Sequence, residues 1–212
     1  RDERRLYVID TEDLVIDEVT SLEFRPDKLE IGPDDQSLAI LSKVDSALTV
    51  VEMDDIENQD TITFASTPVD FAVSLLRNYA CVIHRDNTAS IVRLGGPELL
   101  KSMEVGIEPV AVALEPFHRY AFVANRQSRT LTVIDLEERE LLMTINCEST
   151  PRALTSMATA VGNWLYIANE EEPWMSVVAF GKYDVERDEE PDTELFGFKL
   201  SLDVGQFPYA MY

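Results

Sequence analysis

Five prolines divide the sequence into units of nearly constant length. Pro26, Pro68, Pro109 and Pro151 are separated by 42, 41 and 42 residues, and Pro208 follows after 57. Each unit contains short runs rich in β-branched and aromatic residues, and these runs are separated by residues typical of turns. A strand-rich repeat of about 42 residues predicts an all-β fold, namely a β-propeller with one four-stranded blade per repeat.

The third unit shows its four strands most clearly. They are expected at residues 109–114, 119–125, 130–135 and 140–145, and we label them a, b, c and d in chain order. The third residue after each repeat proline is apolar in every unit, as a packed layer between neighbouring blades requires. These residues are Leu29, Phe71, Val112, Leu154 and Met211.

Three segments of the third unit have a recognisable pattern. They are Val105-Gly-Ile-Glu-Pro109, Tyr120-Ala-Phe-Val-Ala-Asn125 and Leu131-Thr-Val-Ile-Asp135. They resemble the YVTN family of β-propeller repeats, with its Gly-x-x-Pro, Tyr-Val-x-Asn and Ser-Val-Ile-Asp segments. The fourth unit lacks the glycine, and the second has His84-Arg85 where the Val-x-Asn segment ends. The resemblance implies an exported, extracytoplasmic protein, in a family whose members share architecture more than chemistry.

The aligned units predict a single propeller domain over residues 1–212. Residues 4–25 match strands c and d only, and residues 207–212 match strand a only. Full blades are expected at residues 26–67, 68–108, 109–150 and 151–206, the last with an acidic insertion at 184–192. Two alternatives follow: a segment of a larger ring, for example a seven-bladed one, or a closed five-blade ring with one degenerate strand. An uncovered blade face and a free edge strand are unfavourable, which favours the larger ring.

Composition narrows the class of partner. The formal net charge is −22, from 18 Lys and Arg against 40 Asp and Glu. This charge disfavours nucleic acid, whose phosphates need a basic surface. No run of 18 apolar residues is present, so no membrane span is expected.

The cysteines and the known motifs indicate no special chemistry. Cys81 and Cys147 occupy different positions of different blades, so we expect both to be unpaired and to fill space in the core. The chain has no known catalytic, metal or cofactor motif, so we predict no cofactor.

The turns between strands b and c contain the strongest candidate site. Lys43, Arg85 and Arg126 each stand 17 residues after a repeat proline. Equivalent positions of a propeller form a ring on one face, and cations there can hold an anionic ligand or an acidic segment of a protein. The fourth unit breaks the pattern with the acidic residues 170–172. The competing interpretation is that turns simply favour solvated polar residues.

Four neighbouring residues complete the candidate set. His84, Asn125 and Asn169 end strand b of their units, on the same face as the cations. Trp174 follows Pro173 and is expected in the b–c loop of the fourth unit, either as an exposed partner contact or packed on a neighbouring turn. His118 is expected on the opposite face, in the turn between strands a and b of the third unit.

Two functions therefore compete. The first is a non-catalytic binding or scaffold propeller that recognises a protein or another anionic partner through its top-face loops. The alternative is an enzyme or enzyme subunit that resembles lactonase, lyase or quinone-dehydrogenase propellers, which is an analogy of fold only. Lys28, Glu30 and Asp70 are the charged candidates on the innermost strands for such a site. The missing motifs and the ring of cations favour binding.

Overall fold

The chain folds into antiparallel sheets, four of them four-stranded, as expected for propeller blades. The computed structural model describes residues 4–115, 117, 119–159, 162–171, 173–180 and 197–203. Within them, β1 (Arg5–Ile9) pairs with β2 (Ile16–Ser21) in a two-stranded sheet that we call the partial blade. The predicted all-β propeller architecture is confirmed.

Each of the four full blades is a meander of consecutive strands. Blade 1 comprises β3 (Lys28–Ile31), β4 (Ser37–Ser42), β5 (Ala47–Glu52) and β6 (Asp55–Thr63), with a short 3-10 helix, Pro33–Asp35, before β4. Blade 2 comprises β7 (Pro68–Ser74), β8 (Tyr79–His84), β9 (Thr88–Arg93) and β10 (Glu98–Glu104). Blade 3 comprises β11 (Pro109–Leu114), β12 (Tyr120–Asn125), β13 (Thr130–Asp135) and β14 (Glu140–Asn146). Blade 4 comprises β15 (Pro151–Thr159), β16 (Gly162–Asn169), β17 (Trp174–Phe180) and β18 (Gly197–Asp203).

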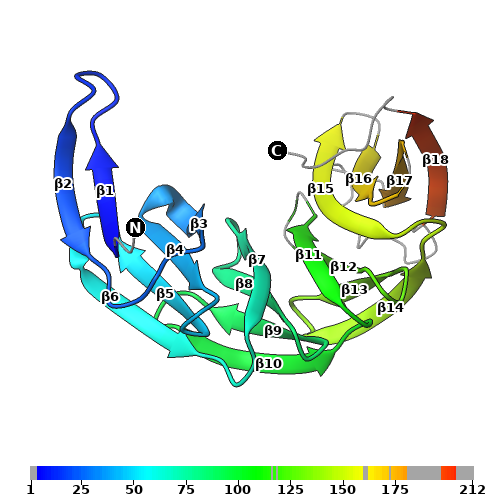
Figure 1. Ribbon diagram of the computed structural model, residues 1–212, viewed down its shortest axis with the longest axis horizontal. Helices are drawn as coiled ribbons and strands as arrows, with labels where there is room; N and C mark the ends of the chain where they lie inside the picture. Colours follow the sequence, from blue (N-terminus) through cyan, green and yellow to red (C-terminus); the bar gives the residue numbers. More distant parts are fainter. Residues whose placement is uncertain are drawn as a thin grey trace, which may run out of the picture.

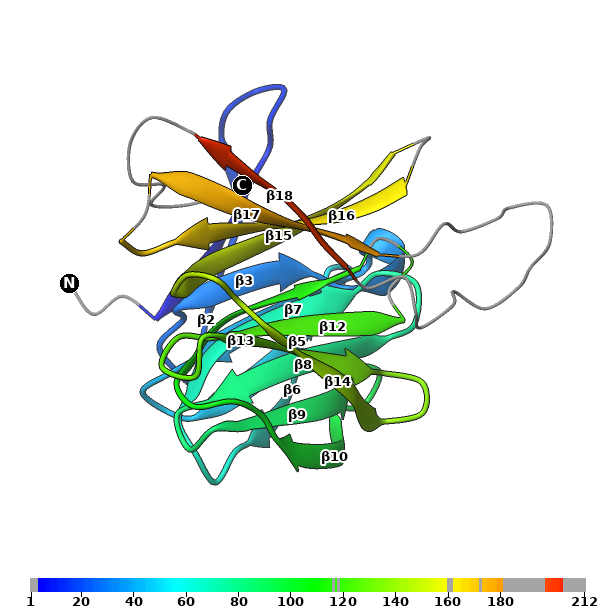
Figure 2. The same ribbon diagram turned by 90° about the vertical axis from the view of Figure 1, so that its right-hand side faces the viewer.

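The blades stand around an arc. The first strands, β3, β7, β11 and β15, face its inside, and β6, β10 and β14 lie on its outside (Figure 1). Seen from the side, the blades are stacked face to face (Figure 2). The repeat prolines begin strands β7, β11 and β15, where a residue without an amide N–H is tolerated because it is the first of its strand.

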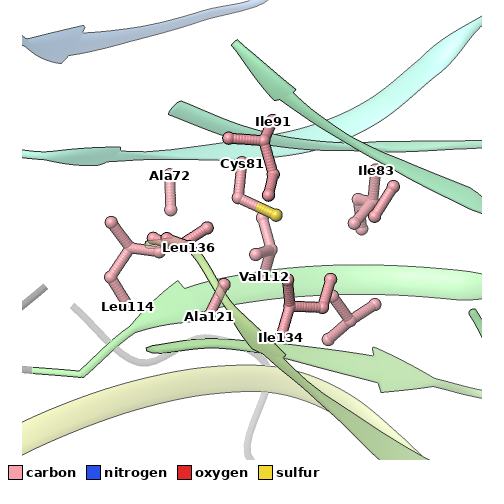
Figure 3. Close-up of a cluster of buried hydrophobic side chains, with 11 residues drawn as sticks. Ala72, Cys81, Ile83, Ile91, Val112, Leu114, Ala121, Ile134 and Leu136 are labelled. Carbon is pink, nitrogen blue, oxygen red and sulfur yellow. The ribbon is translucent and has the colours of Figure 1, made fainter. Parts of the chain in front are cut away.

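The apolar clusters lie between blades. One cluster joins Ala72, Cys81 and Ile83 of blade 2 to Val112 and Leu114 of blade 3 (Figure 3). Equivalent clusters join blades 1 and 2 and blades 3 and 4. Burial raises the pKa of the Cys81 thiol to about 12, so this cysteine is a neutral core residue. Each sheet therefore needs a neighbour to bury its faces.

The motif residues of the third unit hold its turns. One carboxylate oxygen of Asp135 accepts the backbone N–H groups of Glu137 and Glu138, both at 2.9 Å, and closes the turn between β13 and β14. The amide of Asn125 is fully buried at the end of β12 and donates to the hydroxyl of Thr132 at 2.9 Å. Gly106 lies directly against Asn125, which explains the glycine before strand a.

Replacing that glycine tests the close approach. In Gly106→Ala the new Cβ would stand 2.5 Å from Cγ of the buried Asn125, so something must shift. We expect the free energy of unfolding, measured by urea denaturation, to fall by about 1–3 kcal/mol. Gly96 has open space around it and a φ of +67°, which Asn tolerates, so Gly96→Asn is the control. Equal losses in both variants would contradict the steric explanation.

Candidate functional site

The b–c turns of the first three blades present their leading residues on one face of the arc, which we call the b–c face. Lys43 and Arg85 are exposed at the starts of the turns that follow β4 and β8. Arg126 starts the equivalent turn after β12 and is partly exposed. The structure thus places the three predicted cations in equivalent turns. Their binding role stays a prediction.

These turns are braced by the chain that leads into the same blade. The first residue of each turn donates its backbone N–H to a residue next to the repeat proline. The bonds run from Lys43 to the Asp27 carboxylate at 2.7 Å, from Arg85 to the Thr67 carbonyl at 3.0 Å, from Arg126 to the Glu108 carbonyl at 2.8 Å and from Glu170 to the Thr150 carbonyl at 2.9 Å. The turns therefore present their side chains from a fixed backbone, and Glu170 is the blade 4 equivalent of the three cations.

Arg126 differs from the other two cations because two carboxylates hold it. Its guanidinium forms an ion pair with Glu108 and a second one with Glu170, at 3.4 Å. The hydrogen bond with Glu108 raises the pKa of Arg126 further above its usual range. Since Glu170 belongs to the neighbouring blade, the contact ties blades 3 and 4 together. Arg126 thus already has two carboxylate partners within the protein.

Carboxylates also stand beside the two remaining cations. Asp45 lies in the turn of Lys43, and Asp86 follows Arg85 directly. The backbone N–H of Arg25 and the hydroxyl of Ser42 hold the pKa of Asp45 below its usual range. The face is therefore a series of closely spaced opposite charges and not a uniformly basic ring.

The polar residues that end strand b lie beneath this surface. Ser42, His84, Asn125 and Asn169 occupy equivalent positions and have exposed fractions of 0%, 2%, 0% and 1%. Asn169 donates to the Trp174 carbonyl at 2.9 Å and to the Ser176 hydroxyl at 3.1 Å, as Asn125 does to its own strand c. His84, Asn125 and Asn169 bond strand b to strand c, whereas Ser42 bonds to Asp45 within its own turn. All four thus support the turns from below. Direct contact with a partner stays a prediction for His84, Asn125 and Asn169.

His84 begins a series of hydrogen bonds that reaches the outermost strand of its blade. Its Nε2 lies 2.8 Å from the Ser90 hydroxyl, which lies 2.9 Å from the Ser102 hydroxyl on β10. The ring packs on Phe64 with centroids 4.9 Å apart. Burial lowers the pKa of His84, so the neutral imidazole is favoured. In this state the imidazole links β8 to β9 and, through Ser90, to β10.

Trp174 does not lie in a loop. It is the first residue of β17, half-buried, and its predicted place in the b–c loop is wrong. The acidic residues and Pro173 before it are typical of a loop, yet the b–c turn of blade 4 ends before Trp174, as the turn of blade 3 ends before Thr130. Asn169 holds this register, because its amide donates to the Trp174 carbonyl at 2.9 Å.

The charged residues of the innermost strands bond to one another and to the next blade. Lys28 Nζ lies 2.7 Å from Asp70 and 2.9 Å from Glu30. Glu30 accepts the Val73 N–H at 2.7 Å, and Asp70 accepts the Val112 N–H at 3.2 Å. The desolvation of its half-buried carboxylate raises the pKa of Glu30. These carboxylates accept backbone N–H groups of innermost strands, which have no neighbouring strand on the edge that faces the inside of the arc. They are therefore structural links between blades.

A separate hollow of about 430 Å³ lies between blades 1 and 2, away from the b–c turns. It is lined in part by Leu76, Arg77 and Asn78 of the β7–β8 turn and by Glu52 of β5. Arg77 forms an ion pair with Glu137 at 2.9 Å. No group of three or more His, Cys, Asp or Glu side chains in the described part of the chain is arranged to hold a metal ion.

Some predicted features lie outside the described residues. These are His118, Glu172, the acidic insertion at 184–192 and the last strand expected at 207–212. Among the residues that are described, no helix has the length and apolar character needed to cross a membrane.

Comparison with known proteins identifies the fold and no family. No family model matches the sequence, and no curated protein does. A chain of the mitotic checkpoint complex is similar with a TM-score of 0.75 and 10% identity, over 95% of this chain and 59% of that one. The β-propeller domain of Cps50 (Swd1) from Myceliophteria thermophila gives 0.69 and 10%, over 96% and 66%. The dihydro-heme d1 dehydrogenase NirN gives 0.68 and 15%, over 84% and 41%.

These likenesses define the class of protein, which is the β-propellers. The chain spans between 41% and 66% of the length of the three structures. At such identity the likeness shows the fold alone, and the similar structures include both enzymes and assembly components. The YVTN family remains a resemblance of sequence.

The buried histidine makes a testable contribution to stability. Because the pKa of His84 is depressed by folding, the stabilisation from its neutral form is fully present above its ordinary pKa of 6.5 and is lost as the pH falls through the folded-state pKa. We expect His84→Asn, which copies Asn125 and Asn169, to fold and to lose this dependence. Urea unfolding between about pH 7.5 and about pH 5 measures it.

The pH dependence of the unsubstituted protein, measured in parallel, is the reference. If His84→Asn kept the same pH slope, the buried imidazole would not be the titrating group.

Proposed function

We propose that this chain is a non-catalytic binding propeller that recognises an acidic segment of a partner protein through its b–c face. One observation supports this most: Lys43 and Arg85 are exposed on adjacent blades, in equivalent turns whose backbones are braced by hydrogen bonds. A cation presented from a fixed backbone loses less conformational entropy when it binds. Glu108 and Glu170 already engage Arg126, so it contributes by holding the turn of blade 3 against blade 4.

The alternating charges of this face define the partner more closely. Lys43 stands near Asp45, and Arg85 next to Asp86, so a uniformly acidic surface would meet repulsion as well as attraction. A short segment with separated carboxylates fits better than a polyanion. A net charge of −22 further suppresses non-specific adsorption of acidic molecules.

The enzyme alternative has less support from the innermost strands. Lys28, Glu30 and Asp70 are bonded to one another and to backbone groups of the next blade, so they would have to release these bonds to meet a substrate. The resemblance to YVTN repeats supports placing the protein outside the cytoplasm, which belongs to the same proposal.

The double variant Lys43→Ser/Arg85→Ser tests the binding face. Affinity is measured by fluorescence anisotropy with a labelled peptide of alternating Glu and Ser, and by capture of partners from the native source at low and high salt. We expect the variant to bind the peptide roughly tenfold more weakly or worse, because charge-assisted hydrogen bonds are lost. Binding by the unsubstituted protein should weaken with salt, because the contacts are exposed.

A charge-matched variant separates the site from the overall charge. Lys101→Ser/Arg139→Ser removes two exposed cations from β10 and the β13–β14 turn. It should bind like the unsubstituted protein. Equal weakening of both double variants, or none in either, would overturn the assignment of the b–c face.

A further inference from the structure

The hollow between blades 1 and 2 lies at a repeat position where blade 1 has a small residue. Ser37, Tyr79 and Tyr120 each begin strand b and pair with the last residue of strand c, so they are repeat equivalents. Strand b thus begins with tyrosine in blades 2 and 3 and with serine in blade 1.

The two tyrosines fill the interfaces at which they stand. Tyr79 packs against the apolar cluster between blades 2 and 3, and Tyr120, 4% exposed, is part of the cluster between blades 3 and 4. Ser37 faces blade 2 in the same way, because it alternates along β4 with Ala39 and Leu41, which pack on that blade. A serine is too short to fill the space of a tyrosine, and the hollow of about 430 Å³ lies beside it.

Apolar side chains from both blades form walls of this hollow. Val50 lies on β5 of blade 1, and Leu76 and Leu94 belong to blade 2. Val50 and Leu94 are buried, whereas Leu76 is 68% exposed. A cavity of about 150 Å³ already holds benzene, so the hollow has room for the aromatic ring that this interface lacks.

Two polar groups of the hollow are available to a ligand. Ser37 lines it and is only 8% exposed, and in the part of the chain that the structure describes its hydroxyl forms no hydrogen bond. Glu52 lines it as well, and no cation of the described residues pairs with its carboxylate. Arg77 differs, because Glu137 of blade 3 holds its guanidinium at 2.9 Å.

The surrounding charges favour a cationic ligand. Asp35 and Asp54 are exposed, each two residues from Ser37 or Glu52, and they line a smaller hollow of about 320 Å³. The whole chain has a formal net charge of −22. A positively charged group is therefore attracted to this side of blades 1 and 2, where Glu52 offers it a carboxylate.

We propose that this hollow binds a small aromatic amine. The ring lies between Val50, Leu76 and Leu94 in the space that tyrosine fills in the next blades, and the ammonium group donates to the Glu52 carboxylate. The lining residues belong to turns and to strands that are already paired on both sides, so they offer an extended peptide no free strand edge. A free small molecule fits this lining better. The site is separate from the b–c face and independent of the proposed function.

Tyramine is the probe, because it combines a phenol ring with an ammonium group. It is titrated into the isotope-labelled full chain, and the backbone amide shifts are followed by NMR. We expect saturable shifts at Asn78 and Gly95, which line the hollow. Butylamine, which has no ring, and p-hydroxyphenylpropionate, which has a carboxylate in place of the ammonium group, should each bind roughly tenfold more weakly or worse.

Variants of the lining test each contact. Ser37→Tyr supplies the side chain that blades 2 and 3 have, so it should abolish tyramine binding without lowering the urea midpoint of unfolding. Leu76→Ser removes an exposed part of the wall and should weaken binding, which tests the ring contact even if Ser37→Tyr does not fold.

A further pair of variants tests the charge. Glu52→Gln should weaken tyramine binding roughly tenfold and leave the binding of p-cresol, an uncharged ring, as it was. Glu104→Gln removes an exposed carboxylate from β10 and is the matched control, which should bind tyramine normally.

Four results would overturn the proposal. One is the absence of saturable shifts at Asn78 and Gly95. Another is unchanged tyramine affinity in both Ser37→Tyr and Leu76→Ser. The third is equal affinity for tyramine, butylamine and p-hydroxyphenylpropionate. The fourth is tighter binding of a blocked Tyr-Lys dipeptide than of tyramine at the same amides, which would assign the hollow to side chains of a protein.

Discussion

The structure depends on apolar packing between neighbouring blades. Each of the three apolar clusters of the full blades spans two sheets, so neighbouring blades share the core that the described residues form. Phe71 is fully buried, and truncating such a side chain to alanine typically costs about 3–5 kcal/mol. Stability in such an array is set by nearest-neighbour contacts. This explains why the third residue after each repeat proline is apolar and why its exposure depends on the blade before it.

The same constraint decides what the charged residues of the inner strands do. A strand on the inside of the arc pairs with a strand on one side only, so backbone N–H groups on its other edge need acceptors. Glu30 and Asp70 supply them across the blade interfaces, and Lys28 offsets their charge. Their position on the innermost strands suggests a binding site in the central channel. Their hydrogen bonds and ion pairs, however, connect neighbouring blades and are structural.

The repeated residues predicted the fold because they make the contacts that stabilise the strands and turns of each blade. Pro109 begins strand a, Asn125 fixes strand b to strand c, and Asp135 closes the next turn. Contacts between units were harder to predict. Arg126 and Glu170 are 44 residues apart in sequence and meet only because blades 3 and 4 pack side by side. Trp174 was predicted in a loop because it follows acidic residues and Pro173, which are typical of turns, whereas β17 already begins at Trp174.

In the candidate site, buried residues support the turns and the residues above them face the solvent. His84, Asn125 and Asn169 are buried polar residues at the same position, the end of strand b, because each turn needs such a residue beneath it. A polar residue at this position is therefore explained by the fold. The residues that start the turns lie above these anchors. The backbone N–H of each is bonded whatever its side chain, to the Asp27 carboxylate for Lys43 and to a backbone carbonyl for Arg85 and Glu170. The side chain at this position can therefore vary at little cost to stability. Glu170 couples blade 4 to Arg126, whereas Lys43 and Arg85 of blades 1 and 2 are exposed.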